Sequence, residues 1–119
     1  MYEIKYYKNT SGESEITDYI RKLQNKKDKN SRIKYNKISS YIRMLSEKGL
    51  KLGEPYIKHL EDDIWELRPL RDRILFAYLK DNKFVLLHIF MKTTQKTPQR
   101  EIEQAKRNLK DLLNRKSKL

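Results

Sequence analysis

The sequence predicts an α+β protein in which a two-helix hairpin and a C-terminal helix pack against a mainly antiparallel sheet. Three observations predict it. Apolar residues recur at helical spacing twice between residues 14 and 48, three apolar strand-like runs then follow one another, and a Thr-Pro pair precedes a last helical stretch. The expected order is β-α-α-β-β-β-α, and the length of 119 residues predicts one domain spanning residues 1–119.

The first half of the chain predicts a strand and two helices. Residues 2–7 alternate apolar and charged side chains, which is typical of a half-buried strand, and residues 9–12 form a turn. Ser14 can cap a helix with an apolar face of Ile16, Tyr19, Ile20 and Leu23. The polar residues 24–30 predict a connection to a second helix, which begins near Ser31 and ends at Gly49. Its apolar face consists of Ile38, Tyr41, Ile42 and Leu45.

The second half predicts three strands and a helix. After a loop marked by Gly53 and Pro55, the strand candidates are residues 64–67, 74–79 and 84–91, with a hairpin turn at Asp81 and Asn82. For the last helix we expect Thr97 as the N-cap and Pro98 at the first helical position. Its apolar stripe consists of Ile102, Ala105, Leu109, Leu112 and Leu113, and the tail from Arg115 is expected to be frayed.

The charge of the chain favours a polyanionic or acidic partner. The sequence has 28 Lys and Arg against 16 Asp and Glu, a formal net charge of +12. Such a field attracts nucleic acid, an anionic membrane or an acidic protein. The excess lies in residues 31–60 and 92–119, on both sides of the apolar middle of the chain.

Several classes of protein are excluded or not favoured. The chain has no cysteine, which excludes a disulfide scaffold and a thiol nucleophile. The N-terminus has no apolar region typical of a signal peptide, and the longest apolar run, residues 84–91, is far shorter than the roughly 20 residues of a membrane span. We therefore expect a soluble protein of the cytoplasm that does not bind a membrane.

The sequence does not favour a cofactor or a metal ion. Its three glycines form no phosphate-binding loop. Glu61, Asp62 and Asp63 follow His59 and could bind a hard cation, but a solvated turn is the preferred interpretation because consecutive acids point in different directions.

Five cations are candidates for binding phosphate. Three of them surround the Pro69-Leu70 turn and two follow the last apolar run: Arg68, Arg71, Arg73, Lys92 and Lys96. If they converge, they could stabilise a pentavalent phosphorane by fixed positive charge. Alternatively, Arg68 and Arg73 pair with Glu66, Asp72 or the acidic trio, and their role is structural.

The histidines and aromatic residues have weaker signals. His88 lies within a predicted central strand and is expected to be a satisfied core imidazole, whereas His59 is expected in a loop where it could reach a ligand. Trp65 and the three Phe residues are expected in the core. Tyr56 and Tyr78 are the more plausible residues to stack on RNA bases.

Taken in order, these motifs resemble a known family. The runs are Ile64-Trp65-Glu66-Leu67-Arg68, Arg73 to Phe76, Phe84 to Lys92, and Lys96-Thr97-Pro98 with Glu101-Ile102. They resemble the HigB branch of the RelE-like toxins and the phage-derived Gp49-like proteins. The resemblance implies the toxin of a type II toxin–antitoxin system, an endoribonuclease that cleaves mRNA on the ribosome. It also implies a HigA-like helix-turn-helix antitoxin and a complex of the two that binds operator DNA.

The same resemblance assigns the site. Arg73 matches the strand arginine that contacts the scissile phosphate, and Arg68 and Lys92 match the other two catalytic cations. Arg71 and Lys96 are neighbours of these three and are expected to bind RNA. His59 and Tyr56, which the residues themselves suggested, are also expected to bind RNA.

Two departures leave the general base open. Glu66 stands where some relatives have a lysine, and Lys96-Thr97-Pro98 where some have a catalytic tyrosine. Glu66, His59 or a lysine of lowered pKa could transfer the proton. The alternative function is a basic module that binds nucleic acid or a partner without catalysis, either a degenerate toxin or a phage accessory protein.

Overall fold

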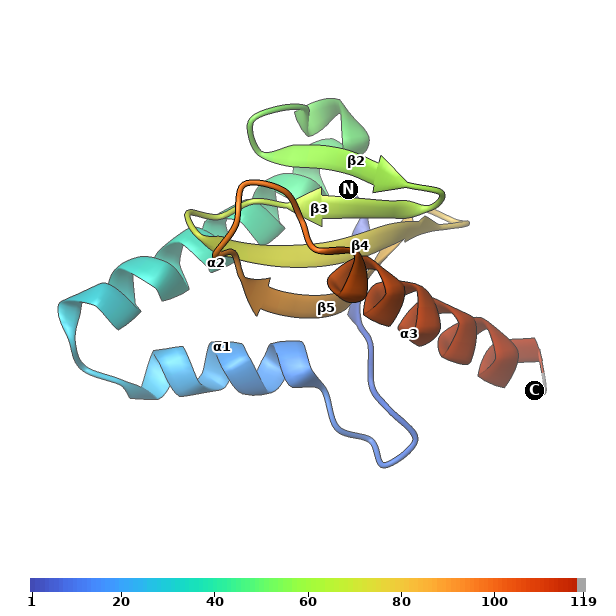
Figure 1. Cartoon of the computed structure of the whole chain (residues 1–119), viewed down its shortest axis with the longest axis horizontal. Coiled ribbons are helices and arrows are strands. Elements are labelled where there is room, and N and C mark those ends of the chain that lie inside the picture. Colours follow the sequence, from blue (N-terminus) through green and yellow to red (C-terminus); the bar gives the residue numbers. More distant parts are fainter. Residues whose placement is uncertain (118–119) are drawn as a thin grey trace.

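The computed structural model describes residues 1–117 and confirms the α+β class. Figure 1 shows the order of elements along the chain. They are β1 (Glu3–Tyr6), α1 (Glu15–Asn25), α2 (Lys29–Lys48), a 3₁₀ turn η1 (Gly49–Leu52), β2 (Ile57–Glu61), β3 (Ile64–Leu67), β4 (Asp72–Leu79), β5 (Lys83–Met91) and α3 (Gln99–Ser117). None of the helices in residues 1–117 has the length and apolar character needed to cross a membrane.

The five strands form one sheet in the order β1-β5-β4-β3-β2. Strands β2 to β5 are antiparallel neighbours, and only β1 pairs in parallel, with the first half of β5. The pairing with β1 stops at Leu86, so β5 continues along this side without a neighbouring strand. The prediction of a mainly antiparallel sheet is confirmed.

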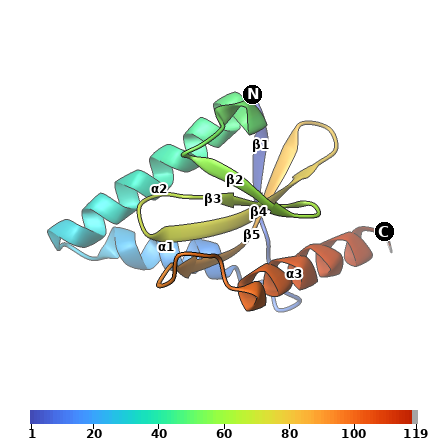
Figure 2. The ribbon, with the colours of Figure 1, turned by 45° about the horizontal axis from the view of Figure 1, so that its top comes forward.

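Helices cover both faces of the sheet. Helices α1 and α2 contribute Ile16, Leu23, Ile38 and Leu45 to the core on one face, and α3 contributes Ile102 and Ala105 to the core on the other. Phe76 and Phe84 are fully buried on the hairpin side. Figure 2 shows the sheet between the α1–α2 hairpin and α3.

Three local signals in the sequence are confirmed. The Ser14 side chain caps α1 by accepting a hydrogen bond from the Thr17 backbone N–H. Gly49 ends α2 at φ +60°, and a Cβ there would lie 2.6 Å from the Tyr2 ring, so the position needs glycine. Asp81 and Asn82 both have positive φ in the three-residue connection, residues 80–82, that joins β4 to β5.

The sequence prediction missed one strand and one cap. Residues 57–61, which we assigned to a loop, form the edge strand β2, so His59 lies on a strand. Exposed polar side chains on this strand hide its alternation, because only Ile57 is fully buried. Helix α2 begins at Lys29, two residues before the predicted start, because Asp28 caps it by accepting from the Ser31 N–H.

Two predictions about α3 are wrong. Thr97 does not cap the helix, since its hydroxyl donates a hydrogen bond to Glu66, and Pro98 precedes the helix and accepts its first backbone bonds. Arg115 is not frayed: it lies within the helix, pairs with Asp111 and donates to the Lys8 carbonyl. The helix continues to Ser117, and the last two residues of the predicted tail, 118–119, lie outside the described residues.

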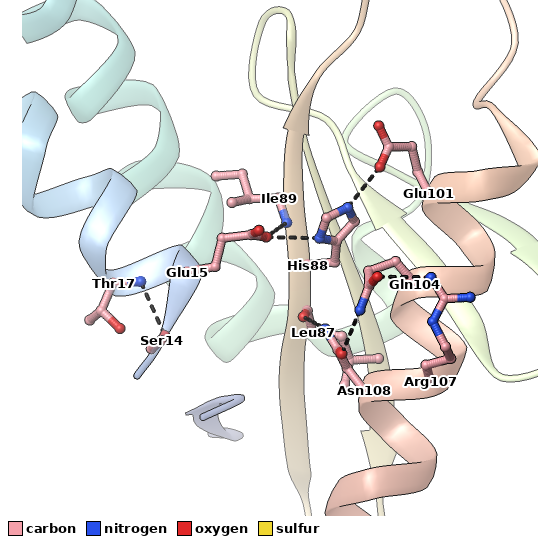
Figure 3. Close-up of polar contacts among 10 residues, drawn as sticks. All are labelled: Ser14, Glu15, Thr17, Leu87, His88, Ile89, Glu101, Gln104, Arg107 and Asn108. Carbon is pink, nitrogen blue, oxygen red and sulfur yellow. Dashed lines mark hydrogen bonds and ion pairs between the residues drawn. The ribbon is translucent and has the colours of Figure 1, made fainter. Parts of the chain in front are cut away.

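His88 joins the two helices that flank the second half of β5. Its Nδ1 lies 2.8 Å from Glu15 at the start of α1, and its Nε2 lies 2.8 Å from Glu101 in the first turn of α3. Figure 3 shows the imidazole between these two carboxylates. The Glu15 carboxylate also accepts the Ile89 backbone N–H. The imidazole has hydrogen-bond partners, as predicted, but both partners are carboxylates. Only a ring that is protonated on both nitrogens can donate to two carboxylates at once.

We expect the free energy of unfolding to fall as pH rises above about 6.5, the ordinary histidine value. Burial lowers the pKa of His88, but the bonds to Glu15 and Glu101 outweigh it and raise the pKa. Because the pKa of His88 is higher in the folded than in the unfolded state, its full contribution to the free energy of unfolding is present below the unfolded-state pKa. This contribution is lost as the pH rises through the folded-state pKa, and it amounts to about 1.4 kcal/mol for each unit by which the two pKa values differ. Denaturant unfolding at several pH values measures this, and His88→Gln should remove this part of the slope. An unchanged slope in that variant would contradict the assignment.

Candidate active site

The candidate site lies at one end of the sheet because three antiparallel strands place their termini there. Strand β3 ends just before Arg68, β4 begins just before Arg73, and β5 ends just before Lys92. Backbone bonds continue the pairing past the strand ends, since the Lys92 N–H donates to the Arg71 carbonyl over 2.8 Å. The antiparallel pairing therefore brings together cations that are distant in the sequence.

A buried carboxylate lies at the centre of these cations. Glu66 on β3 is only 1% exposed, and its Oε1 lies 3.6 Å from Arg68 Nε and 3.8 Å from Arg73 Nε. Its other oxygen accepts the Thr97 hydroxyl bond. The alternative that the two arginines pair with Glu66 is therefore confirmed, and this pairing also holds them side by side.

Arg73 is the most buried of the candidate cations. It is 7% exposed, and its Nη1 donates to the carbonyls of Leu70 at 2.7 Å and Asp72 at 2.8 Å. Burial lowers the pKa of Arg73, and the positive charge of Arg68 lowers it further against the opposing effect of Glu66. The guanidinium therefore lies in an environment that favours a further negative charge.

The two arginines keep unused hydrogen-bonding capacity. Among the described residues 1–117, the buried Nε atoms of Arg68 and Arg73 have no hydrogen-bond partner, although both face Glu66. A buried donor without a partner costs about 1–3 kcal/mol. An anion that let these side chains adjust would recover part of that cost.

Lys92 has a lowered pKa. Burial lowers its pKa, and the nearby charges of Arg73, Arg68 and Lys58 lower it further, while Glu66 opposes them. Lowered lysine pKa values make proton transfer near neutral pH easier.

Two clefts meet at Lys92. The first has a volume of about 420 Å³, and its charged and polar lining includes Lys58, His59, Glu66, Arg68, Lys92, Lys96 and Thr97. The second, of about 410 Å³, is lined by Arg71, Arg73, Lys92, Thr93, Thr94 and Gln95. Lys92 and Gln95 belong to both, so an extended anion could contact both clefts at once.

Six of the seven predicted site residues line these clefts. Arg68, Lys96 and His59 lie in the first cleft, Arg71 and Arg73 in the second, and Lys92 in both. Tyr56 lines neither, because its ring packs edge-on against Tyr41 with centroids 5.3 Å apart. His59 is exposed on β2, where its Nε2 lies 2.7 Å from the Asp62 carbonyl and its ring contacts Trp65. Tyr78 is 44% exposed but contacts Tyr2 and Phe84, away from the clefts.

Two carboxylates of the acidic trio, those of Glu61 and Asp62, form ion pairs with a lysine of α3. Lys106 on α3 binds the carboxylates of both Glu61 and Asp62, and this pairing lowers the pKa of each carboxyl. Within residues 1–117, no three His, Asp or Glu side chains are grouped so as to hold a metal ion.

Sequence reasoning missed the roles of Thr97 and Lys58. Thr97 was assigned as a helix cap, although its hydroxyl binds Glu66 and ties the loop before α3 to the site. Lys58 was overlooked because β2 was not predicted. The apolar residues of this strand, Ile57 and Leu60, lie three positions apart and a register shift follows His59, so no period-two pattern could reveal it.

The comparisons with known proteins identify the family. A family model, described as "Phage derived protein Gp49-like (DUF891)", matches residues 18–110. The chain belongs to this family. The Gp49-like family is a RelE-like, toxin-like family associated with toxins of toxin–antitoxin systems, which generally implies an antitoxin partner. The matched segment of this Gp49-like protein contains every residue of the two clefts. The search of curated proteins found no match.

Proposed function

We propose that this Gp49-like protein is the toxin of a type II toxin–antitoxin system of the HigB type. It is an endoribonuclease that cleaves mRNA bound to the ribosome, in the cytoplasm. The observation that carries this proposal is the convergence of Arg68, Arg73 and Lys92 around buried Glu66, with two clefts that meet at Lys92.

The two arginines are proposed to bind the scissile phosphate. Arg73 is fixed by two backbone carbonyls, so its orientation costs little when substrate binds. Arg68 is about one quarter exposed and can follow the phosphate as its charge increases. Fixed donors aimed at developing charge are worth about 2.7–4 kcal/mol each in comparable sites. Arg71, Lys96 and Lys58 would bind the flanking phosphates.

The nucleophile is proposed to be the RNA's own 2′-hydroxyl. Its oxygen forms a bond to the adjacent phosphorus and gives its proton to water, while the bond from phosphorus to the 5′-oxygen breaks. The leaving 5′-oxygen takes a proton, and we assign this transfer to Lys92 because of its lowered pKa and its place between the two clefts. The products are a 2′,3′-cyclic phosphate and a 5′-hydroxyl.

The ribosome is proposed to supply the positioning that the chain lacks. His88 is held by two carboxylates outside the clefts, and exposed His59 bonds to a backbone carbonyl on the rim. Without an imidazole pair at the phosphate, catalysis depends on charge and on the orientation of the message. Naked RNA should therefore be a poor substrate.

A HigA-like helix-turn-helix antitoxin is the proposed partner, and the complex of the two is proposed to bind operator DNA. A net charge of +12 speeds association with an acidic protein and with RNA alike.

The alternative function, a basic binding module without catalysis, is favoured by one observation. Glu66 already neutralises part of the charge of Arg68 and Arg73. A cleavage assay decides between the two functions.

The test of the proposal is expression of this chain alone in bacteria. Growth should stop, and primer extension on cellular mRNA should reveal new 5′ ends within translated messages. Purified protein should cut a message on programmed ribosomes much faster than the same message alone. Binding of RNA without any cleavage in either setting would favour the non-catalytic module.

A further inference from the structure

An apolar hollow lies beside the candidate site. It has a volume of about 280 Å³ and is lined by Asn30, Ile33, Lys34, Leu70, Arg71, Asp72 and Met91. Ile33 is 42% exposed, Leu70 47% and Met91 49%, and they come from α2, the β3–β4 turn and the end of β5. Three of the seven large apolar side chains exposed in the described part of the chain thus line one hollow.

Leu70 occupies this hollow at a conformational cost. Its φ is +58°, which is rare for a bulky side chain and costs of order 1–3 kcal/mol. Glycine or asparagine would adopt this backbone more easily, and the exposed leucine side chain gains little from the chain's own core. Burial of the side chain against a partner would offset the cost.

The surroundings of the hollow are positive. Two cations line the hollow, Lys34 from α2 and Arg71 from the β3–β4 turn, and the formal net charge of the whole chain is +12. Asp72 also lines the hollow, but it is only 1% exposed. Its carboxylate accepts a hydrogen bond from the Tyr19 hydroxyl and forms an ion pair with Lys34. The rim therefore favours an acidic occupant.

The chemistry of the hollow selects the class of occupant. A second copy of this chain would carry the same charge of +12 and be repelled. RNA bases stack on aromatic rings, whereas the apolar lining here is aliphatic. We propose that the hollow lined by Ile33, Leu70 and Met91 is the docking site for an acidic segment of a protein partner that inserts large apolar side chains.

Such a partner would control the candidate site. Arg71 lines both this hollow and the cleft that contains Arg73 and Lys92. A segment seated in the hollow would therefore neutralise Arg71 and obstruct the second cleft. This consequence rests on the proposed function, because it makes the segment an inhibitor of RNA cleavage.

Two synthetic peptides test the docking site directly. One is a 20-residue glutamate-rich peptide with leucine at every third or fourth position, and the other has alanine in place of each leucine. The leucine peptide should shift the methyl NMR signals of Ile33, Leu70 and Met91, while the alanine peptide of equal charge should not. Leu70→Asn, which suits the backbone, should weaken binding more than about tenfold. Ile33→Gln should also weaken binding.

The matched control is Leu113→Gln, which removes an apolar side chain of similar exposure from α3, outside this hollow. It should leave the affinity unchanged. Equal binding of both peptides, or methyl shifts confined to Leu113, would overturn the proposal.

A second measurement separates this inference from the proposed function. On programmed ribosomes the leucine peptide should inhibit cleavage by the parent, and Ile33→Gln should cleave like the parent but resist inhibition. If the parent does not cleave at all, the proposed function fails while the NMR result still decides the docking site. If the parent cleaves and the peptide binds without inhibiting, control of the site through Arg71 is refuted.

Discussion

Arg73→Ala is expected to lower the rate of message cleavage by about 10²–10³ and to relieve growth arrest. The guanidinium it removes is buried, is fixed by the carbonyls of Leu70 and Asp72, and lies beside the Lys92 cleft. The loss of this charge removes stabilisation that the phosphate needs most in the transition state. Single-turnover cleavage on programmed ribosomes and growth at equal expression measure the effect.

Two further variants separate chemistry from folding. Arg73→Ala also removes two bonds within the β3–β4 turn, so its thermal unfolding must be compared with that of the parent. Arg73→Lys keeps the charge but not the rigid fork, and should recover part of the rate. Arg21→Ala removes an exposed arginine that pairs with Asp18 on α1, and should cleave like the parent. A folded Arg73→Ala protein as toxic as the parent would refute the assignment of Arg73.

A single 2′-deoxy nucleotide immediately 5′ to the scissile phosphate should abolish cleavage at that position. The substitution removes the proposed nucleophile and leaves the phosphate contacts to Arg68 and Arg73 in place. The measurement uses a ribosome-bound message with and without the substitution. Cleavage at a second, unmodified site in the same message is the internal control.

The ends of the products provide an independent check. The mechanism requires a 2′,3′-cyclic phosphate at the end of the upstream fragment. A fragment with this end cannot be ligated to an adaptor at its 3′ end, whereas a fragment with a 3′-hydroxyl can. Continued cutting at the deoxy position, or a 3′-hydroxyl product at the control site, would indicate water as the nucleophile.

The parts of the fold that depend on local patterns could be predicted from the sequence. The helix faces, the Ser14 cap, Gly49 and the Asp81-Asn82 turn are set by neighbouring residues, and they appear in the structure. The exception is Leu113, which was predicted on the apolar stripe of α3 but is 48% exposed. Strand β2 could not be predicted because an edge strand buries little, so its polar side chains resemble a loop. Thr97 was misassigned because its partner Glu66 is 31 residues away in the sequence.

For the candidate site, the sequence indicated the cations but not their arrangement. The resemblance to toxins pointed to Arg68, Arg73 and Lys92, and sheet pairing brings them together around Glu66. Whether the arginines face a carboxylate or solvent depends on tertiary contacts, so both alternatives had to stay open. Tyr56 remains a predicted RNA-binding residue: its ring packs against Tyr41 and it lines neither cleft, but its carbonyl accepts the Arg68 backbone N–H.

The early end of β1 has a consequence for the behaviour of the protein in solution. Beyond Leu86, no strand in the described part of the chain pairs with β5 on that side. An open edge of this kind can recruit a strand from another molecule into a growing sheet. At this edge the Glu15 carboxylate accepts a hydrogen bond from the Ile89 backbone N–H. This contact places a negative charge and the start of α1 against the edge. A strand from another copy would have to displace that charge and leave His88 without one of its partners. The same contact that joins α1 to the sheet thus protects the chain against aggregation through β5.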